Sequence, residues 1–275
     1  MKNLRTILTL MMVVAIAVTL VACGGENKDF DYATSVDGAL VVAEAGSAGE
    51  ELATANEFFV NAKFTAVDSM ATALMDVASG TSDIAIVDYV TSIGSIGEGT
   101  DFANLAVVEG QDFSPEEYGI AFRKGSDIVP AVNAAIAELI NDGTMDKIAA
   151  DYKLDALLIK DGKAFDDAVT EGDLAYIKDK GELTIGITLF APMNYEDENQ
   201  ELIGFETEFA EAVCAKLGVD ANFVEINWNS KEIELNSKNI DCIWNGMTIT
   251  EERKENMSVS NPYMGNKQVM VAKTK

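Results

Sequence analysis

The sequence predicts an α/β protein with two lobes. From Ala39 onwards, short apolar runs typical of buried parallel strands alternate with helical patterns. The chain of 275 residues is long enough for two domains of ~100–200 residues each. Residues 155–172 are weakly patterned and rich in Asp, Lys and Gly, which predicts a surface connector between two structured segments.

The segment before this connector predicts the first series of strands and helices. Ser47 and Glu50 have the spacing of a capping box, which starts a helix after the first strand. Asp68 is the predicted cap of a second helix, and Gly80 is its predicted end. The third strand leads directly to Asp88. The predicted strands are residues 40–43, 63–67, 84–87 and 118–122.

The second series begins with apolar residues at helical spacing between positions 129 and 140, and Asp142-Gly143 closes that helix. A later helix carries apolar residues from Phe205 to Leu217 and ends at Gly218. A polar turn is predicted at residues 196–201. The predicted strands of this part are residues 183–188, 221–226, 240–243 and 268–272.

The first 22 residues have the pattern of an export signal. Lys2 and Arg5 precede an apolar run over residues 7–21, which is shorter than the ~20 apolar residues of a membrane span. Leu20-Val21-Ala22-Cys23 resembles the end of a lipoprotein signal, in which the cysteine becomes the lipidated first residue. The alternative is an ordinary signal with an accidental cysteine. The pattern predicts an extracytoplasmic protein anchored through Cys23, with residues 23–38 as a polar tether.

Composition excludes several classes of function. The formal net charge of −26 argues against nucleic acid, and it leaves membrane attachment to the acyl chains. The chain has no histidine, which excludes Ser-His-Asp and Cys-His catalysis and removes the commonest zinc ligand. Cys214 and Cys242 lie in apolar patterns, which favours two buried thiols over a disulfide, although spacing alone does not establish either.

Three groups at strand ends can bind a small charged ligand, because ligands of open α/β sheets bind beyond the carboxyl ends of the strands. The loop before the first helix, with Ser47 and Ala48, favours an anion, and without a Gly-Lys-Ser/Thr ending a small carboxylate fits better than a nucleotide. Asp88 suits an ammonium group. Thr250 caps a short helix that aims Arg253, whose planar fork reads carboxylates. The alternatives are a capped turn, a solvated helix cap and a surface ion pair.

Two aromatic residues and one acidic turn complete the candidates. Phe190 and Trp228 follow strands within loop patterns, where an aromatic ring can stack on a ligand, although such residues are more often core. The acidic turn at residues 196–201 lacks the spaced oxygen ligands and central glycine of a calcium loop. The sequence therefore predicts no metal site there.

Two segments of the chain resemble the bacterial extracellular solute-binding proteins of family 3, which bind amino acids for ABC importers. Residues 183–273 resemble the opening lobe of that family, and residues 39–152 resemble the remainder. The matching positions of the opening lobe are 183–188, 190–195, 204–206, Trp228, 245–253 and 260–263. The matching positions of the remainder are 45–51, 80–89, 117–124 and Gly143-Thr144. The resemblance implies a two-lobed, type II periplasmic-binding-protein fold with a ligand cleft between the lobes.

The order of these segments departs from the family, whose chain runs from the opening lobe to the second lobe and back. Here the family's second lobe (residues 39–119) precedes its first lobe (residues 120–275), which implies a circular permutation with 155–172 as the bridge. We therefore expect a single covalent crossing near residues 118–124, with the chain's end beside it and a mobile open state.

The resemblance implies a lipid-anchored binding protein that captures an amino acid as a zwitterion and delivers it to an ABC importer permease. Arg253, the Thr248 N–H and the helix start at Ser47-Ala48 would bind the carboxylate. Asp88 and the Gly246 carbonyl would bind the ammonium.

Phe190 and Trp228 would flank the ligand's side chain. The resemblance implies a monomer, without cofactor, metal or catalytic residue. The amino acid itself is left open, since it depends on positions such as Glu44, Val87, Leu189 and Asn245, whose orientations the sequence does not determine.

Two other functions remain open. Some relatives of this fold are cyclohexadienyl-type dehydratases that use a carboxylate in the cleft as acid or base, and Glu44 is the candidate for that role. A perturbed pKa would strengthen this alternative. The other is a sensor lobe that serves a membrane receptor.

Overall fold

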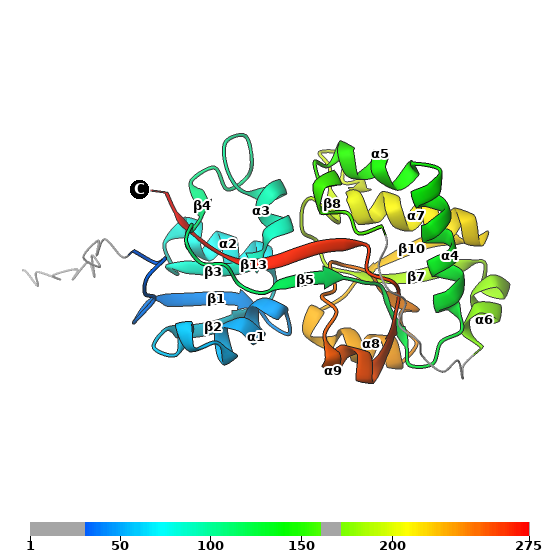
Figure 1. Ribbon diagram of the computed structural model, residues 1–275, viewed down its shortest axis with the longest axis horizontal. Coiled ribbons are helices and arrows are strands. Elements are labelled where there is room, and N and C mark those ends of the chain that lie inside the picture. Colours follow the sequence, from blue (N-terminus) through cyan, green and yellow to red (C-terminus); the bar gives the residue numbers. More distant parts are fainter. Residues whose placement is uncertain (1–30, 161–171, 275) are drawn as a thin grey trace, which may run out of the picture. The chain divides into compact units, whose positions relative to one another are not determined.

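The computed structural model describes residues 31–160 and 172–274, which form two α/β lobes (Figure 1). The predicted leader, Cys23 and most of the predicted connector lie outside the described residues. The α/β class and the two-lobed architecture are confirmed by two separate main sheets.

The lobe that we call the β1 lobe has a sheet in the order β2-β1-β3-β13-β4. Parallel strands β1 (Leu40–Glu44), β2 (Lys63–Val67) and β3 (Ile84–Asp88) are joined by helices α1 (Ala48–Ala55) and α2 (Met70–Ser79), and α3 (Tyr89–Ser95) follows β3. The fourth and fifth members are β13 (Met264–Lys273), antiparallel to β3, and β4 (Leu105–Val107). Glu44 and Asp88 therefore lie at the same edge of the sheet, at the carboxyl ends of neighbouring strands.

The other lobe, which we call the β7 lobe, has a sheet in the order β10-β7-β11-β6-β12. Its strands are β6 (Ala121–Arg123), β7 (Glu182–Ile187), β10 (Asp220–Glu225), β11 (Cys242–Ile243) and β12 (Met257–Val259). Its helices are α4 (Ile128–Asn141), α5 (Thr144–Asp151), α6 (Asp173–Lys180), α7 (Phe205–Leu217), α8 (Lys231–Asn236) and α9 (Glu251–Asn256). The described residues also form a hairpin of β8 (Tyr195–Glu196) and β9 (Leu202–Ile203) and the 3-10 turns Glu57–Phe59, Asp155–Leu157 and Trp228–Ser230.

The chain crosses between the lobes twice. It leaves the β1 lobe between β5 (Pro115–Tyr118) and β6, and it returns between β12 and β13. β5 and β13 run side by side, paired from Met264 with Tyr118 to Lys267 with Pro115 (Figure 1). The predicted single crossing is therefore wrong. The prediction that all of residues 120–275 belong to one lobe is also wrong for the last strand, because β13 completes the sheet of the β1 lobe. The circular permutation stays a prediction that rests on the resemblance.

Two smaller predictions also change. Residues 31–38 are not a free tether, because Val36 is fully buried in the β1 lobe and the main chain of Gly38 donates to the carbonyl of Asn61 at 2.9 Å. The cap of α2 is Ser69 rather than Asp68, since the Ser69 hydroxyl accepts from the Thr72 N–H at 3.1 Å.

The β7 lobe buries two thiols and one charged side chain. Cys214 and Cys242 are buried free thiols, as predicted. Arg123 on β6 is buried and ion-pairs with Asp173 at 3.1 Å and Asp241 at 3.4 Å, and its Nη1 donates to the Ile240 carbonyl at 2.9 Å. These partners satisfy a buried charge that would otherwise be costly.

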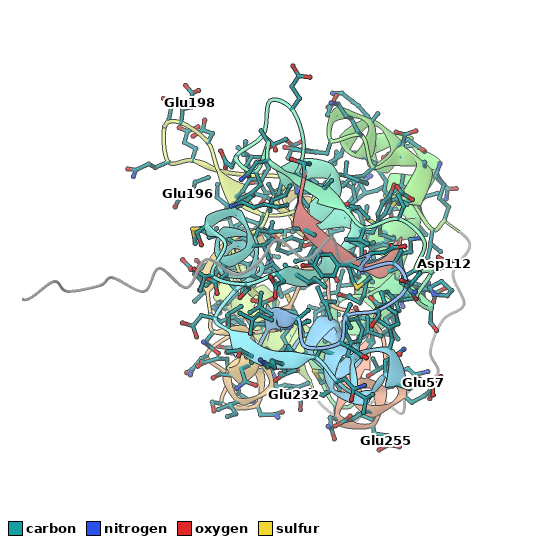
Figure 2. The ribbon with its side chains drawn as sticks, turned by 90° about the vertical axis from the view of Figure 1, so that its left-hand side faces the viewer. Glu57, Asp112, Glu196, Glu198, Glu232 and Glu255 are labelled. Atoms are coloured by element: carbon teal, nitrogen blue, oxygen red, sulfur yellow. The ribbon has the colours of Figure 1, made fainter. Side chains whose placement is uncertain are left out.

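The surface acids are spread over both lobes. Glu57, Asp112, Glu196, Glu198, Glu232 and Glu255 stand at separate points of the surface (Figure 2). The large negative charge is therefore distributed, and it says little about the charge that any one cavity prefers.

Candidate functional site

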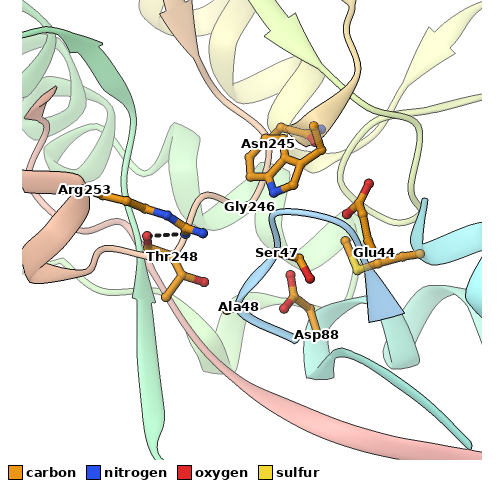
Figure 3. A pocket seen from close by; sticks show the side chains of 10 residues that line it. Glu44, Ser47, Ala48, Asp88, Asn245, Gly246, Thr248 and Arg253 are labelled. Carbon is orange, nitrogen blue, oxygen red and sulfur yellow. Dashed lines mark hydrogen bonds between the residues drawn. The ribbon is translucent and has the colours of Figure 1, made fainter. Parts of the chain in front are cut away.

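A narrow cavity lies where the two lobes meet, at the carboxyl ends of β1 and β3 (Figure 3). The centre of a water-sized sphere can move within a volume of about 10 Å³ there, which is room for about one water molecule. A ligand larger than a water molecule therefore needs the lobes to move apart. The lining residues are Glu44, Ser47, Ala48, Met70, Asp88, Trp228, Asn245, Gly246, Thr248 and Arg253.

Arg253 comes from α9 of the β7 lobe, and it is 5% exposed. Thr250 caps this helix by accepting from the Arg253 N–H at 3.1 Å, as predicted. Arg253 Nη1 donates to the Thr248 carbonyl at 2.7 Å, which aims the guanidinium across the cavity (Figure 3). Nη2 lies 3.3 Å from Oε1 of Glu51, whose side chain is 56% exposed. An exposed partner exchanges readily with another carboxylate.

Asp88 comes from the end of β3 in the β1 lobe, and it is buried rather than a solvated cap. Its carboxylate accepts from the Tyr118 hydroxyl at 2.7 Å, from Asn266 Nδ2 at 3.1 Å and from Gln268 Nε2. Burial raises the pKa of Asp88, whereas these donors and the positive charge of Arg253 lower it. The donors hold the carboxylate in one orientation toward the cavity.

Ser47 and Ala48 bring the start of α1 to the cavity. The Ser47 hydroxyl accepts from the Glu50 N–H at 3.2 Å, and the Glu50 carboxylate reaches back to the Gly46 N–H at 2.6 Å. This is the predicted capping box, except that the Glu50 carboxylate accepts from the N–H of Gly46 rather than from the N–H of the cap residue Ser47. A helix start of this kind favours an anion through its N–H groups and dipole.

Gly246 and Thr248 follow β11 and form the wall of the β7 lobe. Gly246 has φ +54° and donates its N–H to Glu206 at 2.8 Å. A Cβ at Gly246 would lie 2.9 Å from Phe190 Cζ, so only glycine fits there. Burial raises the pKa of Glu206 to about 7, although hydrogen bonds from Tyr263 and the Gly246 N–H oppose this.

Trp228 lines the cavity, whereas Phe190 does not. The Phe190 ring packs beneath Gly246 and is buried behind the wall. Lys231 Nζ lies over the Trp228 ring, 4.7 Å from its centroid, in a cation–π contact. Sequence patterns place both aromatics at strand ends but do not say which side of the loop each ring occupies.

Sequence reasoning missed Met70 and left the pocket positions open. Met70 is the first residue of α2, so the order of strands could have placed it at the same edge as Asp88. Glu44 and Asn245 do line the cavity, whereas Val87 and Leu189 do not. The donors to Asp88 from β5 and β13 carried no local signal, because they depend on strand pairing.

Within residues 31–160 and 172–274 no cluster of three or more acidic or cysteine side chains is arranged to hold a metal ion. Among the same residues, no helix has the length and hydropathy needed to cross a membrane.

Comparison with known proteins relates the last third of the chain to one family. Residues 183–275 match the model of the bacterial extracellular solute-binding proteins, family 3. The L-cystine-binding protein TcyJ of Escherichia coli K12 is 36% identical over 94 residues, which are 34% of this chain and 35% of that protein. The arginine-binding extracellular protein ArtP of Bacillus subtilis 168 is 32% identical over 95 residues, 34% of this chain and 37% of that protein.

The chain therefore spans about a third of the length of the curated relatives it matches. Among solved structures, the arginine-bound domain 1 of a mutant TmArgBP is 33% identical, with a TM-score of 0.33 over 36% of this chain and 84% of that one.

Proposed function

We propose that this protein captures an amino acid between its two lobes and delivers it to an ABC importer. The observation that carries this proposal is the placement of Arg253 and Asp88 on opposite lobes around one cavity. A ligand carboxylate would bind the Arg253 fork, the Thr248 N–H and the helix start at Ser47 and Ala48. Its ammonium would bind Asp88 and the Gly246 carbonyl.

Such a site couples binding to closure. The carboxylate and ammonium of one amino acid reach partners from both lobes only when the lobes are together, so the ligand favours the closed state. Trp228 would lie against the ligand's side chain. The names of the matching relatives, which include cystine-, arginine- and octopine-binding proteins, support an amino acid as the ligand.

Membrane attachment and delivery complete the proposal. The leader ending at Cys23 supports a lipid anchor on the extracytoplasmic side, and the match of residues 183–275 supports an importer permease as the partner. The proposed form is a monomer without cofactor.

A thermal-shift screen tests the binding function. The ligands are the twenty amino acids with cystine, ornithine and citrulline. At 100 times its dissociation constant a true ligand stabilises the fold by ~2.7 kcal/mol. A purified, folded protein that none of these compounds stabilises would contradict the proposal.

A cleft enzyme of the dehydratase type is the second candidate, because Glu44 lines the cavity and burial raises its pKa to about 8. A protonated carboxyl in a cavity is a general acid. Prolonged incubation with a prephenate-like compound decides between the two. Turnover that Glu44→Gln abolishes favours the enzyme, whereas saturable stabilisation without turnover favours the binding protein.

A further inference from the structure

Glu44 is a buried acidic residue to which the proposed binding of the ligand's carboxylate and ammonium groups gives no role. It ends β1, is 2% exposed and lines the cavity together with Asp88 (Figure 3). Its Oε1 is buried and has no hydrogen-bond partner among the described residues. A buried, unpaired carboxyl oxygen is costly, so its position at the cavity wall points to a partner supplied by the ligand.

The charges around the cavity indicate what that partner is. Arg253 would pair with the ligand's carboxylate and Asp88 with its ammonium, which leaves Glu44 as an additional negative group. We propose that Glu44 selects an amino acid whose side chain ends in a positive group. This inference rests on the proposed function and adds the substrate class.

Three charged groups face Glu44. Asp88 raises its pKa and Lys231 lowers it, while Arg253 lines the opposite side of the same cavity. The Lys231 ammonium is engaged elsewhere, since it donates to the carbonyls of Gly46 at 2.9 Å and Trp228 at 3.3 Å. It makes no hydrogen bond to the free Oε1 of Glu44.

The apolar neighbours suit a long cationic side chain. Met70 and Trp228 line the same cavity, and they offer surface to the methylene stem of a lysine- or arginine-like ligand. The charged end of such a side chain can also interact with the face of an aromatic ring. An anionic side chain would instead meet Asp88 and, above about pH 8, an ionised Glu44, and both charges would repel it.

This selection has a protonation signature. Burial, followed by the charge of Asp88, raises the pKa of Glu44 to about 8. A cationic side chain binds the ionised form, so its binding releases a proton below pH 8. A neutral side chain with a carbonyl would instead accept a hydrogen bond from the protonated form. The two ligand classes therefore have pH dependences of opposite sign.

Calorimetry with L-arginine and L-citrulline tests the inference, because the pair differs mainly in side-chain charge. Wild type should bind arginine at least about tenfold more tightly at pH 8, and this ratio should fall by up to about tenfold for each pH unit below 8. The ratio cancels the titration of Asp88, which contacts the part common to both ligands. Glu44→Gln should bring the ratio near one at every pH. Glu57→Gln, which removes an exposed acid from the same lobe, should leave it unchanged.

Each outcome decides one question. A wild-type ratio of one or less at pH 8, or a pH 8 ratio that Glu44→Gln does not lower, overturns the role of Glu44 while amino-acid binding stands. Failure of wild type to bind any amino acid overturns the proposed function itself. If Glu44→Gln does not fold, the pH series on wild type decides, since a ratio that stays constant from pH 8 to pH 6 overturns the inference.

Discussion

Lys231 Nζ in the β7 lobe donates a hydrogen bond of 2.9 Å to the main-chain carbonyl of Gly46 in the β1 lobe. The same carbonyl lies 3.4 Å from Arg253 Nη2, so two cations of one lobe meet one acceptor of the other. Burial, followed by the charge of Arg253, lowers the pKa of Lys231 to about 8. The contact holds the lobes together at the edge of the candidate site.

Replacing Lys231 with Met should open the ligand-free protein. The variant keeps the hydrocarbon stem and loses the donor to Gly46, so the closed state loses a contact that the open state lacks. Small-angle scattering should show a larger radius of gyration without ligand. Lys178→Met, on the exposed side of α6, is the control and should match wild type. An identical scattering curve for the two variants would show that the bond from Lys231 to Gly46 does not hold the lobes closed.

Replacing Arg253 with Ala should weaken amino-acid binding by ~2–5 kcal/mol, because the ligand carboxylate loses its buried cationic partner. Calorimetry with the ligand found in the thermal screen measures the loss. Lys254→Ala on the same helix is the control and should bind as wild type does. An Arg253 variant within threefold of wild type would exclude the guanidinium as the carboxylate partner.

Asp88→Asn should weaken binding to a similar extent while leaving the fold intact. The amide keeps the volume, its oxygen can accept from Asn266 and Gln268, and its NH2 group can donate to the Tyr118 hydroxyl oxygen, but it removes the negative charge that an ammonium needs. Asp101→Asn, an exposed change in the same lobe, controls for the loss of one charge. Equal affinities for the two variants would show that Asp88 does not bind the ligand's ammonium group.

The unfolding free energy should fall as the pH rises from about 5 to 8. Burial raises the pKa of Glu44 to about 8 and that of Glu206 to about 7, from an ordinary value of 4.5, so the folded state holds protons that the unfolded chain has released. The stabilisation is fully present below pH 4.5 and is lost as the pH passes the folded values, by ~2–4 kcal/mol for Glu44. Urea unfolding should show a flatter pH profile for Glu44→Gln than for Glu57→Gln. Parallel profiles would contradict the assignment.

Cys23→Ser should move the protein from the membrane fraction to the soluble fraction, because the acyl chains are the proposed anchor. Fractionation with a high-salt wash measures this, since salt removes electrostatic attachment and leaves lipid anchoring in place. A variant that still sediments with membranes after the wash would show that the anchor lies elsewhere.

The sequence by itself determined the local features of this protein. The capping of α1 by Ser47 and of α9 by Thr250 follows from residues three positions apart, and these spacings are visible in one dimension. The alternation of strands and helices predicted the α/β class, and the order of strands brought Asp88 to a strand end.

Only the tertiary structure decided which elements meet. The pattern of β13 marks a buried strand, but it does not say which sheet takes it, and that choice overturned the single crossing. Gln268 donates to Asp88 across 180 residues, and Phe190 lies behind Gly246 instead of in the cavity. Local patterns encode propensity and burial, whereas strand pairing and side-chain direction depend on partners distant in the chain. The unpaired oxygen of Glu44 is of this second kind, since it is defined by what the fold brings near it.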